Sequence, residues 1–154
     1  MRDIEALLQP FTGYLELGMY EDAEKELQNF LPELKEHPFL ALAQLELIMA
    51  RKQWQEGVVL GKTLCQRWPE EFEFWFKTAY CLHELRQTVE AKETLLQAPV
   101  AIRESAIFYY NLACYETQLG NLAEGRRLLG KSCKIDSGFH QDALHDPDLQ
   151  PLWE

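Results

Sequence analysis

The sequence predicts an all-α protein, an α-solenoid of antiparallel helix pairs. The first observation is a column of small residues that recurs every 34 positions, at Ala23, Gly57, Ala91 and Gly125. A fixed period of this length is the sequence signature of a repeat architecture. The second observation is that 47% of the residues are hydrophobic, which is enough for a folded core and argues against disorder. Since one helix pair cannot bury its apolar face alone, neighbouring pairs are expected to stack.

The small column has a physical reason. Two antiparallel helices approach closely only where a side chain is small, and a larger residue would overpack the contact. Other columns keep the same period and are mostly bulky. Three positions before the small column stand Tyr20, Trp54, Thr88 and Leu122, and sixteen positions before it stand Leu7, Ala41, Trp75 and Tyr109.

Several local motifs fit this period. Arg67-Trp68-Pro69 closes one repeat, Trp75 opens the next, and the run 109–114 is followed by Leu119-Gly120-Asn121. With its 34-residue period, the chain resembles the tetratricopeptide repeat (TPR) family over about residues 4–152. The resemblance implies a right-handed superhelix in a single domain, 1–154. Its parts would be repeats at 4–37, 38–71, 72–105 and 106–139, and a cap and tail at 140–154.

The elements follow in order. Helices are expected at 3–17, 20–34, 38–51, 54–67, 71–85, 88–97, 105–119, 122–135 and 138–145. Gly18 and Gly120 mark turns within pairs, whereas Lys52 stands where the family has glycine.

Prolines modify this plan. Pro10 should kink the first helix or mark its true start. Pro32 and Pro99 should shorten the second helices of their pairs. Residues 99–104 then form a longer loop than the family has, and Ser105 caps the next helix.

The tail is expected to fold back through Leu149, Leu152 and Trp153, because the last exposed helix face of a solenoid needs a cap. A free peptide ligand for another protein is the alternative. A second question concerns possible metal ligands near the C-terminus. The favoured interpretation is a solvated loop, and a metal site is the lesser alternative, for His140, Asp142, His145, Asp146 and Asp148.

Charge and composition limit the partners. The net charge is −10 and the pI is about 4.9. A protein this acidic repels phosphate backbones, so nucleic acid is not an expected partner. The N-terminus lacks the apolar core of a signal peptide, and no stretch is long enough for a membrane span. The four widely spaced cysteines are interpreted as reduced thiols, with a disulfide framework as the lesser alternative. Together these observations predict a cytoplasmic protein.

The resemblance implies that the first helix of each pair lines a concave binding face. An acidic, aromatic surface there would take a protein or peptide with apolar anchors and basic flanks. The alternative is that neighbouring helices or the tail cover these residues. The candidate partner-binding residues are Phe39, Leu42, Glu46, Glu73, Phe76, Lys77, Tyr80, Tyr110 and Cys114.

A known subset of the family clamps C-terminal carboxylates with basic and amide side chains. The matching positions here are Leu8, Thr12, Ala43, Glu73 and Lys77, so only one of them carries a positive charge. We therefore expect no carboxylate clamp.

No enzyme is expected, because the sequence contains no nucleotide-binding loop, no nucleophile elbow and no zinc-protease motif. Cys81 and His83 are two residues apart on a helix and so point to different faces. No cofactor, catalytic site or metal is expected. The leading hypothesis is a protein-interaction scaffold. Alternatives are a small acidic chaperone of a secretion system and a self-associating subunit that pairs through gaps at Gly57 and Gly61.

Overall fold

All secondary structure in the computed structural model is helical over the described residues, which are 3–30, 32 and 36–154. No strand occurs in these ranges. The chain divides into two compact units, Met1–Phe74 and Trp75–Glu154. The all-α prediction is therefore confirmed, whereas a single continuous domain stays a prediction.

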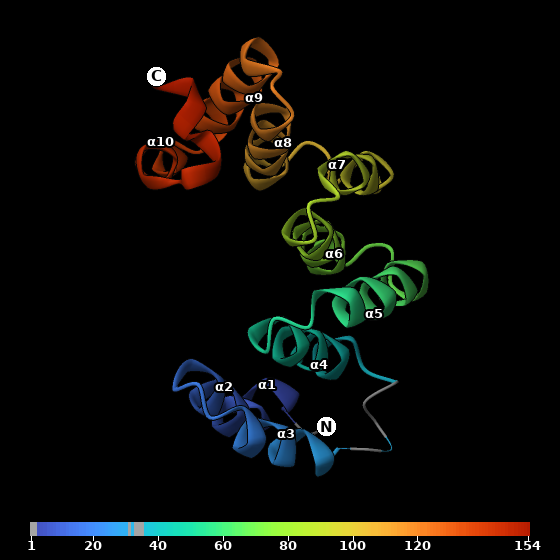
Figure 1. The fold of residues 1–154 in the computed structure, drawn as a ribbon. Helices are drawn as coiled ribbons and strands as arrows, with labels where there is room; N and C mark the ends of the chain where they lie inside the picture. Colours follow the sequence, from blue (N-terminus) through green and yellow to red (C-terminus); the bar gives the residue numbers. More distant parts are fainter. Residues whose placement is uncertain (1–2, 31, 33–35) are drawn as a thin grey trace. The chain divides into compact units, whose positions relative to one another are not determined.

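The first unit contains α1 to α5, with bounds Ile4–Leu7, Gln9–Glu16, Tyr20–Gln28, Pro38–Ala50 and Trp54–Arg67 (Figure 1). Consecutive helices from α2 to α5 pack on one another. Pro10 lies in the first turn of α2, and a separate α1 precedes it, so the prediction that Pro10 marks a helix start is confirmed. The second helix ends at Gln28 rather than near residue 34, while residues 31 and 33–35 lie outside the described ranges.

The core of the first unit joins α2, α3 and α4. Phe11 is 2% exposed, and its burial stabilises the unit by about 1.5–3 kcal/mol. Ala23 is fully buried, as the small column requires. The buried cluster consists of Leu8, Phe11, Ala23, Leu27, Leu40, Ala43 and Leu47.

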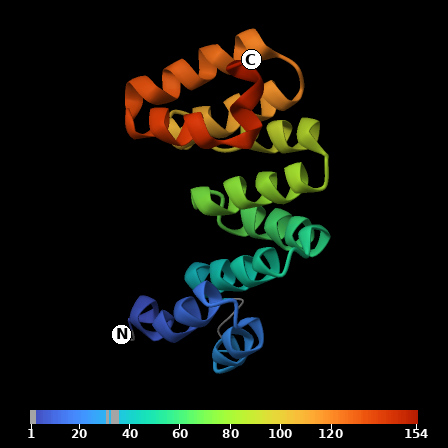
Figure 2. The same ribbon diagram turned by 60° about the vertical axis from the view of Figure 1, so that its left-hand side comes forward.

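The second unit begins within the first turn of α6 (Phe72–Glu84) and continues through α7 (Thr88–Leu96), α8 (Ala106–Gln118), α9 (Leu122–Ile135) and α10 (Gly138–His145). A 3₁₀ helix, η1 (Pro147–Leu152), follows and packs on α8, α9 and α10 (Figure 2, red segment). The shortening of α7 before Pro99 is confirmed. The Ser105 hydroxyl also caps α8 as predicted, accepting from the Phe108 N–H at 3.3 Å.

The four helix pairs share one turn geometry. Residues 18, 52, 86 and 120 all adopt positive φ, with values of 73°, 58°, 65° and 87°. The next residue in each turn donates its N–H to a carbonyl five positions back, at 2.8–3.1 Å. This is the six-to-one bond of a Schellman motif, in which the left-handed residue favours glycine. Gly18 and Gly120 meet that preference, whereas Lys52 and Arg86 adopt the conformation despite their side chains.

The small column is buried throughout. Ala91 is fully buried, and Gly57 and Gly125 are buried as well. A Cβ added at Gly125 would overlap the Thr117 hydroxyl and lie 3.4 Å from the Ala113 carbonyl oxygen. The predicted close approach of two helices is therefore observed directly between α8 and α9.

Candidate interaction surfaces

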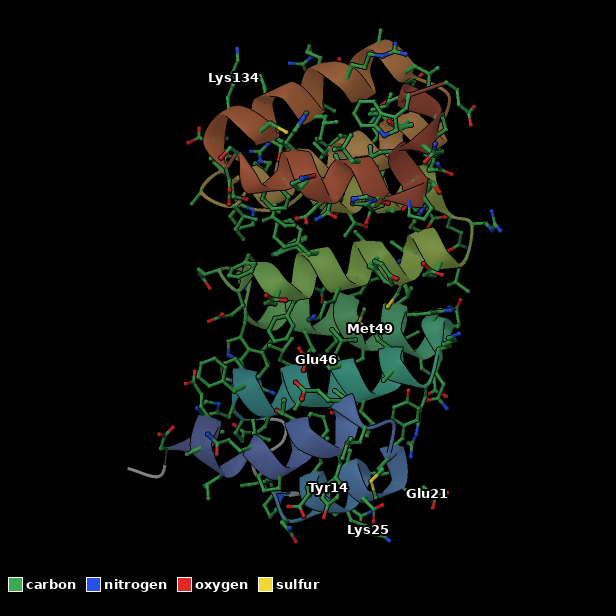
Figure 3. The ribbon with its side chains drawn as sticks, turned by 90° about the vertical axis from the view of Figure 1, so that its left-hand side faces the viewer. Tyr14, Glu21, Lys25, Glu46, Met49 and Lys134 are labelled. Atoms are coloured by element: carbon green, nitrogen blue, oxygen red, sulfur yellow. The ribbon has the colours of Figure 1, made fainter. Side chains whose placement is uncertain are left out.

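In the first unit, the candidate residues lie on α4 and at the start of α6. Phe39 is 42% exposed, while Leu42 and Glu46 are half-buried. Glu46 and Met49 are three residues apart and share one face of α4, as Figure 3 shows. Glu73 is half-buried in the first turn of α6. α4 therefore carries a partly accessible aromatic ring and a carboxylate, and the start of α6 carries a second carboxylate.

In the second unit, α6 carries three candidates. Tyr80 is 45% exposed, and Phe76 and Lys77 are half-buried. Partial burial of the Tyr80 ring, and secondarily the nearby Glu84 carboxylate, raise the pKa of the Tyr80 phenol, so it stays a neutral hydrogen-bonding group. This part of α6 presents an aromatic ring that is apolar on its faces and polar at its tip.

The remaining two candidates are covered. Tyr110 is 8% exposed and Cys114 is 4% exposed, because the tail lies across α8. The expectation of an open binding face at Tyr110 and Cys114 is corrected here. The tail's own apolar residues fix it in place: Leu149 is fully buried and Leu152 is 6% exposed. The predicted folding back of these two leucines is confirmed, and Trp153, although 43% exposed, also folds back and donates its indole N–H to the Ala143 carbonyl at 3.4 Å.

Asp146 makes the central polar contacts of the tail. Its Oδ2 atom accepts a hydrogen bond from the Tyr110 phenol at 2.7 Å and lies 3.7 Å from the Cys114 Sγ atom, which donates to it. Its Oδ1 atom accepts from the Asp148 N–H at 2.9 Å, which caps η1. Burial, and then the Asp146 carboxylate, raise the pKa of both Tyr110 and Cys114, so both donors keep their protons.

Asp148 ties the tail to α6 and α8. Its Oδ2 atom lies 3.1 Å from the His83 Nε2 atom, and its backbone carbonyl accepts from the Gln118 amide at 2.8 Å. The other ring nitrogen of His83 lies 2.9 Å from the Thr88 hydroxyl. Both ring nitrogens of His83 thus have a side-chain partner, and neither partner is Cys81.

A hollow of about 450 Å³ borders these contacts. Its walls come from α6, α8 and the tail, and they include Tyr80, Glu84, Asn111 and Pro147. The hollow therefore gives solvent access to the edge of the Asp146 and Asp148 contacts.

The solvated-loop interpretation of the C-terminal acidic and histidine residues is right only for the exposure of three of them, and these three lie on the helix α10 rather than in a loop. His140, Asp142 and His145 are exposed, whereas Asp146 and Asp148 are half-buried and hydrogen-bonded. The sequence contained a signal that Asp146 is ordered. Aspartate is favoured at the N-cap of a helix and proline at its first position, and Asp146 directly precedes Pro147. The part played by His83 had no comparable signal.

The comparisons with known proteins assign no family. No protein-family model matches the chain, and no curated protein matches it. Within the part of the chain that the structure describes, no helix has both the length and the apolar character to cross a bilayer.

Proposed function

We propose that the chain is a TPR-type α-solenoid that binds a segment of another protein along the first helices of its pairs. The repeated geometry supports this proposal. Four turns stand 34 residues apart. Each of them has one residue at positive φ, followed by the same six-to-one backbone hydrogen bond. That period and the buried small column are the features on which the resemblance to the family depends.

One observation carries the functional part of the proposal: the α8 face already holds a peptide segment, the tail. The docked part of the tail is the 3₁₀ helix η1 with its cap Asp146, and it packs through two buried leucines and side-chain hydrogen bonds to α6 and α8. A first-helix face of this fold is therefore suited to holding a short segment with apolar anchors.

The α4 face offers the same positions to a partner. Leu42 and Glu46 stand 68 residues before Tyr110 and Cys114, which is two repeat periods. With Phe39 partly exposed as an aromatic anchor and Glu46 and Glu73 as acidic groups, we expect a partner with apolar residues and Lys or Arg flanks. On α6, Phe76, Lys77 and Tyr80 extend the list of candidate contacts.

The test places a photo-crosslinking amino acid at Phe39, and in a matched protein at Val59, which is 62% exposed on α5. The Phe39 probe should capture a partner segment rich in apolar and basic residues, and the Val59 probe should not. Changing Phe39 to Ala should then weaken binding of that segment about thirtyfold, the loss typical of a central anchor.

Equal capture at both positions would reject the α4 face as the binding surface. Capture of a second copy of the chain would favour self-association instead. Raised salt should weaken the interaction, because basic flanks meet acidic groups.

A further inference from the structure

Three metal-ligating groups converge where the tail crosses α8. They are the Cys114 thiol and the carboxylates of Asp146 and Asp148. One donor atom from each residue lies within 4.8 Å of the other two. The sequence separates Cys114 from Asp146 by 32 residues, so only the folded tail brings the set together.

The spacing is close to that of a bound ion. A tetrahedral zinc ion has bonds of about 2.0–2.3 Å, so its ligand atoms stand roughly 3.3–3.8 Å apart. The Cys114 Sγ and Asp146 Oδ2 atoms are already 3.7 Å apart. A contraction of about 1 Å at the remaining distances would complete the set.

The donor types select the kind of ion. Magnesium and calcium take oxygen ligands in sixfold or higher coordination, and a thiolate does not suit them. One sulfur and two carboxylate oxygens suit a borderline ion that accepts four ligands, and zinc is the ordinary choice.

Both carboxylates of the set have neighbouring side chains that can fix their orientation, as metal ligands commonly do. The Tyr110 phenol donates to Asp146 at 2.7 Å, and His83 lies 3.1 Å from Asp148 while the Thr88 hydroxyl orients its ring. Such outer contacts fix the orientation of ligating carboxylates. The neighbouring hollow leaves room for a water as the fourth ligand.

We propose that Cys114, Asp146 and Asp148 form a binding site for one zinc-type divalent ion, with Tyr110 and His83 as positioning residues. On binding, the Cys114 thiol releases its proton to solvent, and the metal–sulfur bond replaces the thiol's hydrogen bond to Asp146. The ion would thereby join α8 to the tail. This proposal does not depend on the proposed partner binding.

The test is a cobalt(II) titration of the full chain under a phosphine reductant. We expect one equivalent to give a thiolate-to-cobalt charge-transfer band and the intense visible bands of tetrahedral cobalt. Zinc should then abolish both signals. Cys114→Ser should remove the charge-transfer band, whereas the matched control Cys133→Ser, a half-buried thiol outside the set, should keep it.

Further variants separate metal binding from folding. Asp148→Asn preserves size and should weaken metal binding at least tenfold, and His83→Gln should weaken it about tenfold, as outer-contact changes do. Zinc should raise the Tm of the wild type and not that of Cys114→Ser. If Cys114→Ser does not fold, Asp148→Asn decides the question.

A folded wild type with no thiolate–cobalt band at tenfold excess of metal would overturn the proposal. A band that persists in Cys114→Ser or is unweakened in Asp148→Asn would overturn it too. In either case, the three side chains would hold the tail through hydrogen bonds and would not bind a metal ion.

Discussion

The α4 and α8 helices are first helices of their pairs, and each has 13 residues, yet equivalent positions differ in exposure. Leu42 and Glu46 of α4 are half-buried, whereas Tyr110 and Cys114, two periods later, are buried. The added cover on α8 comes from the tail, which contributes Asp146, Asp148 and two buried leucines. The comparison teaches that the exposure of this face is set by what lies on it and not by the helix alone.

The largest expected effect removes that cover. Leu149→Ala should cost about 2–5 kcal/mol in the free energy of unfolding, because Leu149 is fully buried. It should also make Cys114 accessible to alkylation, measured by peptide mass spectrometry with Cys133 as the internal reference. Leu144→Ala, at a residue 44% exposed on α10, is the control and should change stability by less than about 0.5 kcal/mol. Unchanged alkylation of Cys114 in the Leu149 variant would show that the tail is not its cover.

The next effect concerns helix packing in the second unit. Gly125→Ala should lose about 1–3 kcal/mol, since its Cβ would overlap the Thr117 hydroxyl, which is held by the Ala113 carbonyl at 2.7 Å. Gly130→Ala on the same helix meets nothing within 4 Å and should gain up to about 1 kcal/mol. Thermal unfolding measures both changes. Hydrogen exchange should place the Gly125 loss in residues 75–154, and a loss spread equally over both units would show that the two units unfold together.

A smaller effect should be the same in both units. Lys52→Gly and Arg86→Gly should each stabilise the fold by about 0.5–1 kcal/mol. A side chain at positive φ costs roughly 1–2 kcal/mol, and the larger backbone entropy that glycine loses on folding offsets part of the gain. Gly18→Ala, at φ 73°, is the reverse control and should lose about 1 kcal/mol. Chemical denaturation measures all three. If only one of the two glycine variants were more stable than the wild type, a residue with a side chain at positive φ would not cost the same in the two turns.

The smallest effect is confined to the first unit. Arg51, the residue that follows α4, forms an ion pair with Glu24 of α3 at 2.9 Å, and Arg51→Ala should cost about 0.2–1 kcal/mol because the pair is partly exposed. This hydrogen bond, with the Arg51 charge, lowers the pKa of Glu24 from its ordinary 4.5. The contribution is therefore full above pH 4.5 and is lost as pH falls through the lowered value.

Stability curves of wild type and Arg51→Ala should accordingly converge as the pH falls below that point. Lys25→Ala is the control, since its 3.6 Å pair with Asp22 is more exposed, and it should have little effect at any pH. A gap that widens in acid would contradict the assignment.

Much of the fold was predictable because its signals are local. The proline positions and the Ser105 cap each depend on a few neighbouring residues, and the 34-residue column is legible because it repeats at a fixed interval; the corresponding features are present. Lys52 was noted as a departure from glycine, yet it adopts the glycine conformation, because the turn's hydrogen bonds outweigh the steric cost.

The candidate surface was less predictable, since exposure depends on distant residues. Tyr110 and Cys114 have the right helical position for an open face, but Asp146 of the tail contacts both residues and Phe139 of α10 packs on the Tyr110 ring. The contact between His83 and Asp148 joins different elements and follows no spacing rule. Cover by the tail was the alternative expectation for the candidate residues, and no spacing rule identified Tyr110 and Cys114 as the ones that it would reach.

The contact between His83 and Asp148 spans 65 residues, whereas the bond from Ser132 to the Ala106 carbonyl, between α8 and α9, spans 26. Closing a longer loop costs more chain entropy, so helix pairs should form first and the tail should dock afterwards. Refolding of the second unit is then expected in two steps, with the Tyr110 and Cys114 face exposed between them. In that interval the apolar, aromatic face of α8 is exposed, and another molecule can bind to it before the tail docks.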